Sequence, residues 1–382
     1  MKESHFNTRT VHFQKKEKAR NMSKAKPIYQ TSAFVFTDLD DMESFYEGEK
    51  EYLYTRYSNP NTDDLGKGVA LLEEADDGVA AASGMAVILA GILAIAKQGD
   101  HIIASDDLYG GTYTLFAQEL ANFDIEVSFV SFKNLDDVKD AITEKTVLLY
   151  TESITNPLLR VEQLAEVIQL AKAKKIKTII DNTFATPYLL QPIKLGADLV
   201  VHSATKYIGG HSDVTAGVLA GEQSLIDAAR AKIVTFGSNL TPFEAWLACR
   251  GLKTLSIRME RQSANAAALA AAMEENEGVS RVYYPKDVSE KGNGAMVSID
   301  LKQTVNVETF FKSLGWVKIA PTLAGVETTV SYPIRTSHRT IPEKLRQELG
   351  IGEQLVRISV GIEDERDIIE AFQRAITLAQ SK

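Results

Sequence analysis

The sequence predicts an α/β protein: a large domain with a mostly parallel sheet covered by helices, followed by a smaller α+β domain. From about residue 63 to residue 203, helical patterns alternate with short runs of β-branched residues, which is typical of βα units. Beyond about Asn239, one long Ala- and Leu-rich helix precedes short strands with helices between them. The expected parts are an extended N-terminal arm (1–55), a large domain (56–240) and a C-terminal domain (241–382).

The individual elements follow from the spacing of apolar residues. In the large domain, helical spacing predicts helices at 63–75, 85–97, 112–123 and 161–175. Apolar runs predict strands at 78–82, 101–105, 126–132, 146–152, 177–182 and 198–203. In the C-terminal domain we expect helices at 243–277, 307–314 and 364–379, and strands at 281–284, 295–301 and 355–361. Residues before about 55 show no strong periodicity, which predicts the arm.

Composition excludes several classes of protein. The 382 residues include 42 Lys and Arg against 51 Asp and Glu, a formal charge of −9, and 45% are hydrophobic, as in ordinary soluble globular chains. The negative charge disfavours nucleic acids and anionic membranes as partners. The single cysteine, Cys249, lies in an apolar run and cannot form an internal disulfide. We therefore expect a buried, inert thiol and a cytoplasmic protein.

Two segments resemble targeting or membrane sequences. The first 24 residues are charged and lack the apolar stretch of a secretory signal. Residues 78–96 are 19 uncharged residues, close to the length of a membrane span. However, Ser83 and Gly84 interrupt this stretch after five residues, which favours a short strand, a glycine turn and a buried helix. We expect no membrane segment.

Polar residues follow apolar runs where ligands of parallel sheets bind, at the carboxyl ends of strands. Ser83, Gly84 and Met85 begin a helix directly after a strand. Backbone N–H groups and the helix dipole favour a phosphate there, although a simple N-cap has the same sequence pattern. Asp181 closes another strand, where a buried carboxylate needs a partner, or else it serves as a cap or turn residue.

Two basic residues complete this set. Lys206 follows the strand at 198–203 and is flanked by the hydroxyls of Ser203 and Thr205. A lysine at the mouth of a buried strand loses its proton readily and can form a Schiff base. Arg357, within a strand, offers a planar fork to a substrate carboxylate, or else forms a structural ion pair with an acid such as Glu363. A phosphate cradle, a reactive lysine, an acid and a carboxylate-binding arginine together predict a pyridoxal phosphate enzyme.

Motifs along nearly the whole chain support this interpretation. They are PIYQTSAF, YTRYSNP, AAASGMA, DDLYGGTY, TESITNPLLRV, the block DNTFATPYLLQPIKLGADLVVHSATKYIGGHSDVTAG, RGLKTLSIRMERQ and VRISVGIED. With them the sequence resembles the Cys/Met-metabolism (trans-sulfuration) family of pyridoxal phosphate enzymes. The resemblance implies an aspartate-aminotransferase-like fold (fold type I) and pyridoxal 5′-phosphate as cofactor. It also implies a homo-oligomer, a dimer that shares its active sites and assembles further into a tetramer.

The resemblance assigns roles to individual residues. Lys206 would be the Schiff-base lysine, Asp181 would face the pyridine nitrogen, and Tyr109 would stack on the ring and move protons. The cofactor's phosphate would be held by Ser83, Gly84, Met85, Ser203 and Thr205, and by Tyr54 and Arg56 of a neighbouring subunit. The substrate would be bound by Arg357, Asn156, Thr322 and Tyr54. Without the resemblance, Tyr54 and Tyr109 would be ordinary packing residues and Arg56 a surface charge.

The sequence departs from the family pattern at several places. Asn61 replaces the threonine of the family's NPT, and Gly111 stands where methionine γ-lyases typically have cysteine. Pro321 stands where cystathionine-handling γ-enzymes often have glutamate, and Ala324 replaces a glycine of the family's SLGG. The segment 285–294 is short and lacks the family's SHPxH sequence, so we expect a remodelled pocket rim.

The expected function is γ- or β-replacement or elimination on cystathionine or homoserine esters, with cystathionine γ-synthase or γ-lyase as the first choice. Methionine γ-lyase or O-acetylhomoserine sulfhydrylase activity is the alternative. An aminotransferase and a non-catalytic cofactor-binding protein are further alternatives. The six histidines lack ligand spacing, so we expect no metal, and we expect His202 to be a packing or supporting residue.

Overall fold

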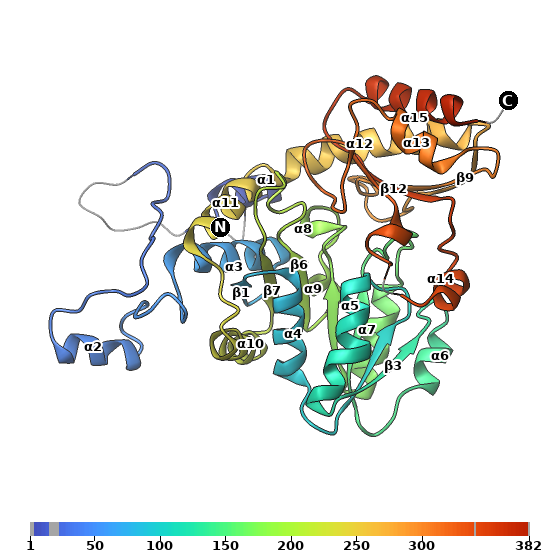
Figure 1. Ribbon diagram of the computed structural model, residues 1–382. Coiled ribbons are helices and arrows are strands. Elements are labelled where there is room, and N and C mark those ends of the chain that lie inside the picture. The colour runs from blue at the N-terminus through green and yellow to red at the C-terminus, as the bar shows by residue number, and fades with distance from the viewer. Residues whose placement is uncertain (1–3, 15–22, 340, 381–382) are drawn as a thin grey trace.

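The computed structural model describes residues 4–14, 23–339 and 341–380, and Figure 1 shows an N-terminal arm, a large sheet layer and a smaller one above it. Within these residues the large sheet has the strand order β1-β7-β6-β5-β4-β2-β3. Its strands are β1 (Asp77–Ala81), β2 (His101–Ser105), β3 (Glu126–Val130), β4 (Thr146–Glu152), β5 (Lys177–Asp181), β6 (Leu199–Ser203) and β7 (Gly217–Gly221). Along the sheet, the neighbouring strands β3, β2, β4, β5 and β6 are all parallel to one another. Strand β7 is antiparallel to both of its neighbours, β6 and β1. The predicted mostly parallel sheet is confirmed.

Helices cover both faces of this sheet. One face packs against α4 (Gly84–Ile95) and α10 (Gln223–Phe236), and the other against α6 (Leu135–Asp140), α7 (Leu164–Lys174) and α9 (Pro192–Leu195). The strand interiors are apolar because both faces are buried, and each fully buried Val, Leu or Ile contributes about 1.5–3 kcal/mol. The other helical segments of this part of the chain are α3 (Pro60–Glu73), α5 (Gly110–Thr114), η1 (Leu115–Glu119), η2 (Leu120–Phe123) and α8 (Thr186–Leu189).

The C-terminal part has its own sheet, in the order β10-β11-β12-β9-β8. Its strands are β8 (Val279–Tyr283), β9 (Met296–Leu301), β10 (Lys318–Ile319), β11 (Thr329–Ser331) and β12 (Leu355–Ser359). Its helices are α11 (Pro242–Leu252), α12 (Leu255–Glu274), α13 (Val307–Ser313), η3 (Pro333–Arg335), α14 (Glu343–Leu349) and α15 (Glu365–Ala379). Apolar residues of α12, α13 and α15 form one core with the strands. The boundary at residue 240 stays a prediction.

The prediction of one helix over 243–277 is wrong, because the chain breaks between α11 and α12. Gly251, a poor helix former, lies in the last turn of α11. Its carbonyl oxygen accepts hydrogen bonds from Arg258 Nη2 (2.9 Å) and Thr254 Oγ1 (3.1 Å). These side chains satisfy a carbonyl that would otherwise need the next helical turn.

Other differences from the prediction are local. Two elements were not predicted: β7, which is glycine-rich, and α10, whose apolar residues Ile226, Ala229 and Ile233 do follow helical spacing. The helix expected over 112–123 changes its hydrogen-bond register twice and becomes α5, η1 and η2. The arm contains two short helices, α1 (Phe6–His12) and α2 (Leu39–Tyr46), and α2 projects away from the body in Figure 1.

Residues 78–96 form most of β1, a turn and α4, as the sequence predicted. In the described part of the chain, none of the helices combines the length and the apolar character needed to cross a membrane.

A close approach of two backbones holds α3 against β1. A Cβ atom on Gly66 would lie 2.5 Å from the carbonyl oxygen of Gly78, and one on Gly78 would lie 2.4 Å from that of Gly66. The clashing atoms belong to the backbones of α3 and β1, so an added methyl group could be accommodated only by shifting the whole helix or strand. Gly66→Ala should therefore lower the free energy of unfolding, measured in urea, by about 1–3 kcal/mol. Gly352→Ala is the control, because a Cβ there has no neighbour within 4 Å. Equal stabilities for the two variants would contradict this packing.

Candidate active site

A cavity of about 930 Å³ lies at the carboxyl ends of the large sheet's strands. Glu152, Asp181 and Ser203 line it from the last positions of β4, β5 and β6. Register explains their convergence, because Glu152 pairs with Asp181 in neighbouring parallel strands. The C-terminal domain contributes the remaining wall, which includes Arg357 of β12.

Lys206 lies in the turn after β6, and its side chain lines this cavity. Its Nζ donates a hydrogen bond to Thr322 Oγ1 at 3.1 Å. Burial, and secondarily the positive charge of Arg357, lower the pKa of Lys206 to about 8. A substantial fraction of this amine is therefore neutral near physiological pH and available as a nucleophile or base.

Asp181 faces the cavity as a buried acid. Its Oδ1 accepts a hydrogen bond from the backbone N–H of Thr183 at 2.9 Å. Burial nevertheless raises the pKa of Asp181 above its usual value. Burial and the charge of Asp181 also raise the pKa of the neighbouring Glu152 well above its usual range. The ionised form of Asp181 is thus costly until a cation faces it, which fits a protonated pyridine nitrogen.

The start of α4 offers an anion cradle beside these acids. Ser83 caps the helix, its Oγ accepting from the N–H of Ala86 at 3.2 Å. A Cβ on Gly84 would lie 2.9 Å from the Cβ of Ser203, so only glycine brings the helix start this close to β6. Met85 also lines the cavity. The helix dipole and these small residues fit a phosphate.

Thr205, expected beside this cradle, also lines the cavity. Its hydroxyl donates to the carbonyl of Ala216 (3.2 Å) and accepts from the N–H of the same residue (3.0 Å). Thr205 therefore fixes the turn that carries Lys206, and a phosphate would have to share its hydroxyl.

Arg357 is fixed by hydrogen bonds and not by the ion pair that was the structural alternative. Its Nη1 donates to Asn156 Oδ1 at 2.7 Å, and its Nε donates to Ser331 Oγ at 3.1 Å. Glu363 accepts instead from the N–H and hydroxyl of Thr328. The structure thus brings the predicted residues Asn156 and Arg357 together at the cavity wall. A guanidinium oriented in this way suits a carboxylate.

A histidine stands behind this pair. His338 Nε2 donates to the carbonyl oxygen of Asn156 at 3.0 Å, and its Nδ1 accepts from Ser337 Oγ at 2.8 Å. Burial, and secondarily the charge of Arg357, lower the pKa of His338 to about 4, so the ring is neutral. His338 therefore holds the backbone of Asn156 without adding a charge.

Tyr109 is at the cavity and is 42% exposed, so it is not a core packing residue. Its backbone N–H donates to Glu152 Oε1 at 2.7 Å. Its ring lies over Gly111, where a Cβ would come within 2.6 Å of the ring's Cε1. The glycine that departs from the methionine γ-lyase pattern therefore leaves room for the ring in this position.

Two other departures shape the wall beside Lys206. Pro321 and Thr322 line the cavity, and Ala324, at φ +72°, occupies the conformation that glycine prefers. The N–H of Ala324 donates to Ser359 Oγ at 2.7 Å, which holds the turn. The short segment 285–294 lies elsewhere: Lys291 Nζ donates to the Tyr188 carbonyl at 3.0 Å, and no residue of the segment lines the cavity.

Tyr54 and Arg56 do not line the cavity of their own chain. The Arg56 guanidinium lies 5.1 Å from the ring centroid of Tyr57 and 5.8 Å from that of Tyr54, and its Nη1 donates to the Val234 carbonyl at 3.2 Å. The structure therefore separates this predicted pair from Lys206.

Sequence reasoning missed several residues at the site. Glu152 is the last residue of β4 and Thr183 lies just after β5, so the rule that found Asp181 could have found them. Ser331 and His338 carry no comparable signal. His202, expected as a supporting residue, is buried, and its Nε2 lies 2.7 Å from Glu73 Oε1. Among the residues described, no three His, Cys, Asp or Glu side chains are placed to hold a metal ion.

The chain is similar to known proteins over most of its length. The family model for Cys/Met metabolism PLP-dependent enzymes matches residues 7–377. A cystathionine beta-lyase of Lactococcus lactis is 42% identical over 361 residues, covering 92% of this chain and 93% of the relative. A cystathionine gamma-lyase of Bacillus subtilis is 40% identical with the same coverage. The crystal structure of cystathionine gamma-lyase from Lactobacillus plantarum complexed with L-serine superposes with a TM-score of 0.93 at 35% identity, covering 98% of this chain and 99% of that one.

The lowered pKa of Lys206 predicts a pH dependence for cofactor capture by the cofactor-free protein. The rate constant for capture of pyridoxal phosphate should rise about tenfold per pH unit below pH 8 and level off above it, because only the neutral amine attacks an aldehyde. Arg357→Met removes a neighbouring positive charge, so the pKa of Lys206 and the midpoint should move upward. Stopped-flow absorbance measures both profiles, and a wild-type midpoint near that of free lysine would contradict the prediction.

Proposed function

Because the chain belongs to the Cys/Met-metabolism family of pyridoxal-phosphate-dependent enzymes, we propose that it eliminates or replaces the Cγ or Cβ substituent of cystathionine or a homoserine ester. The chain is a lyase or transferase of trans-sulfuration with fold type I architecture and pyridoxal 5′-phosphate as its cofactor. A cystathionine γ-synthase or γ-lyase is the first choice.

The observation that carries the proposal is the position of Lys206. Its amine, with a pKa of about 8, shares one cavity with the acid Asp181 and with the carboxylate-binding Arg357. Pyridoxal phosphate, when bound, supplies an aldehyde that captures amines and a ring that withdraws electrons from Cα. The cavity of about 930 Å³ accommodates both this cofactor and an amino acid.

The side chains divide the work of proton transfer and binding. Arg357, oriented by Asn156, binds the substrate carboxylate and so places the Cα proton near Lys206 Nζ. Lys206 Nζ takes this proton, which suffices for a substituent at Cβ to leave. For a substituent at Cγ, the same amine, after releasing the first proton, also takes a proton from Cβ. Tyr109 donates a proton to the leaving group, and Asp181 keeps the ring nitrogen protonated.

Members of this family act on different substrates, so the family relationship alone leaves other activities open. An L-methionine gamma-lyase of Fusobacterium nucleatum is 39% identical over 368 residues, so that activity remains an alternative. Gly111 counts against it, because methionine γ-lyases typically have a cysteine at this place, two residues after the stacking tyrosine. O-acetylhomoserine sulfhydrylase activity is a further alternative, and a relative of Bacillus subtilis at 38% identity carries that name together with cystathionine gamma-synthase. An aminotransferase is a further alternative from the sequence, whereas the family relationship indicates an enzyme and so disfavours a non-catalytic cofactor-binding protein.

The arm supports a homodimer that shares its active sites. Val35, Leu39 and Tyr46 are 96%, 77% and 67% exposed, which is unusual for apolar side chains on an ordered segment. A second copy of the chain would cover them and bring Tyr54 and Arg56 to the phosphate cradle of that copy. Pairs of such dimers would form the tetramer.

We also propose a cytoplasmic location. The single cysteine, Cys249, is fully buried, and this burial raises the pKa of its thiol, so it is inert. An enzyme without disulfides suits a reducing compartment.

Replacing the lysine tests the reaction directly. Lys206→Ala should lose about 10³-fold or more in kcat, because both the amine that captures the cofactor and the base at Cα are gone. Activity on cystathionine, methionine, O-acetylhomoserine and O-succinylhomoserine, with and without thiols, measures the loss and identifies the substrate. Lys318→Ala, at an exposed lysine outside the cavity, is the control. Normal turnover by Lys206→Ala would refute the mechanism.

Mixing two inactive variants tests the shared site. In a dimer of Lys206→Ala and Arg56→Ala subunits, one of the two sites has an intact lysine and receives Arg56 from the Lys206→Ala subunit. Random mixing after dissociation should therefore restore about a quarter of wild-type activity. Each variant dissociated and reassembled alone is the control, and a mixture no more active than these would show that Arg56 serves its own chain or none.

A further inference from the structure

The wall that the C-terminal domain contributes to the cavity carries charges that the proposed reaction does not use. Glu308 and Lys312 are four residues apart on α13, so they share one face of that helix. Arg335 ends the neighbouring turn η3. All three side chains line the same cavity as Lys206 and Arg357.

An ion pair and aromatic contacts hold two of these charges in place. Arg335 Nη2 donates to Glu308 Oε1 at 2.8 Å, and its guanidinium lies 5.5 Å from the ring centroid of Tyr332. The Tyr332 ring packs in turn against Phe311 of α13, at 5.6 Å between centroids. Both rings line the cavity as well. Glu308 and Arg335 are therefore held together beside two aromatic rings at the cavity wall.

Fold stability does not account for this pair. The side chains of Arg335 and Glu308 are 67% and 58% exposed, and an ion pair so open to water contributes about 0–1 kcal/mol. The Arg335–Glu308 ion pair instead differs from other surface pairs in lining the cavity. A further cation, Lys312, lies one helical turn from Glu308 and lines the cavity as well.

The charges match a dipolar group. A carboxylate at 308 can accept from an ammonium, while the cations at 312 and 335 can bind a carboxylate. A methyl thioether has no charged group, and an acetyl ester offers the two cations only a neutral carbonyl acceptor and offers Glu308 no ammonium. We propose that Glu308, Lys312 and Arg335 bind the second amino acid end of a substrate with an ammonium and a carboxylate at both ends, a dipolar thioether, and so select it over neutral side chains. This inference rests on the proposed function and specifies its substrate class.

The test compares two thioethers that differ at the distal end. Cystathionine has a dipolar distal end, whereas ethionine, S-ethyl-homocysteine, has an apolar one. The measured quantity is the ratio of kcat/KM for cystathionine to kcat/KM for ethionine with the holoenzyme. In Glu308→Gln and in Lys312→Met this ratio should fall about fivefold, the value of one exposed charge contact, mainly through KM for cystathionine. Added salt should lower the wild-type ratio in the same direction.

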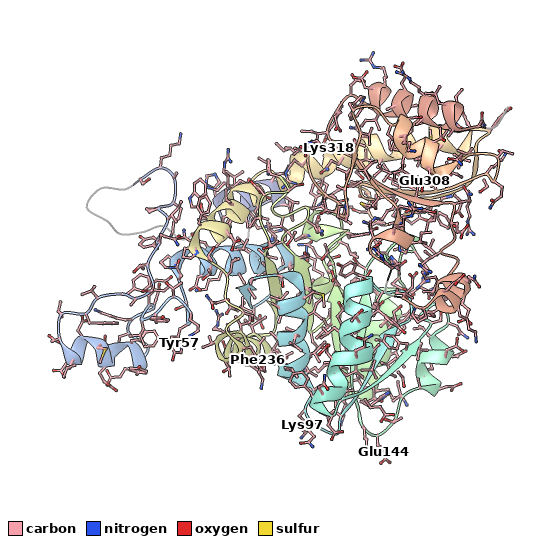
Figure 2. The ribbon with its side chains drawn as sticks, viewed as in Figure 1. Tyr57, Lys97, Glu144, Phe236, Glu308 and Lys318 are labelled. Atoms are coloured by element: carbon pink, nitrogen blue, oxygen red, sulfur yellow. The ribbon has the colours of Figure 1, made fainter. Side chains whose placement is uncertain are left out.

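Lys318→Met is the matched control. Lys318 lies on the same domain, is 63% exposed and pairs with Glu327 at 2.8 Å, but it does not line the cavity. Figure 2 labels Glu308 and Lys318 at separate places on this domain. The control should keep the wild-type ratio.

The outcomes separate this inference from the proposed function. An unchanged ratio in both variants, or a wild type that acts on homoserine esters but on neither thioether, overturns the inference and leaves the proposed reaction standing. A wild type that cleaves ethionine but not cystathionine overturns the inference and also replaces the first choice of function by the methionine γ-lyase alternative. A wild type that turns over neither these thioethers nor homoserine esters refutes the proposed function and the inference with it.

Discussion

The site depends on keeping one amine partly neutral inside the protein. Lys206 is largely buried in the turn after β6, so its ammonium form loses hydration. The positive guanidinium of Arg357 also disfavours the ammonium form, and both effects lower the pKa of Lys206. Thr322 offers this amine a neutral acceptor and no counter-charge. An aspartate in place of Thr322 would stabilise the ammonium and abolish the nucleophile. A neutral hydroxyl at position 322 is therefore compatible with a partly neutral amine at Lys206.

The residues that sequence reasoning found are those whose position follows from one short segment. Asp181 and Ser203 end apolar runs, and parallel strands place such ends at one edge of the sheet, where the structure has them. The predicted strand 146–152 matches β4 residue for residue because both ends change polarity sharply. For this class of residue, local pattern and topology together suffice.

The residues that it missed depend on contacts between distant segments. Ser331 and His338 hold Arg357 and Asn156, and the last two are 201 residues apart in the chain. The break between α11 and α12 depends on Arg258, which binds a carbonyl of the preceding helix, a tertiary choice that helical spacing does not encode. The glycine-rich β7 is a strand because β1 and β6 flank it, and its own composition disfavours a strand.

The candidate reactive residues and the residues expected to select the substrate come from different parts of the chain. Lys206, Asp181 and the phosphate cradle come from the large sheet, whereas Thr322, Arg335 and Arg357 reach the cavity from the C-terminal domain. Relatives about 40% identical to this chain carry the names of a beta-lyase and a gamma-lyase, so identity over the whole chain does not distinguish the reactions. Since the candidate reactive groups come from the large sheet, differences in substrate are expected mainly where the C-terminal wall meets the substrate's distal end.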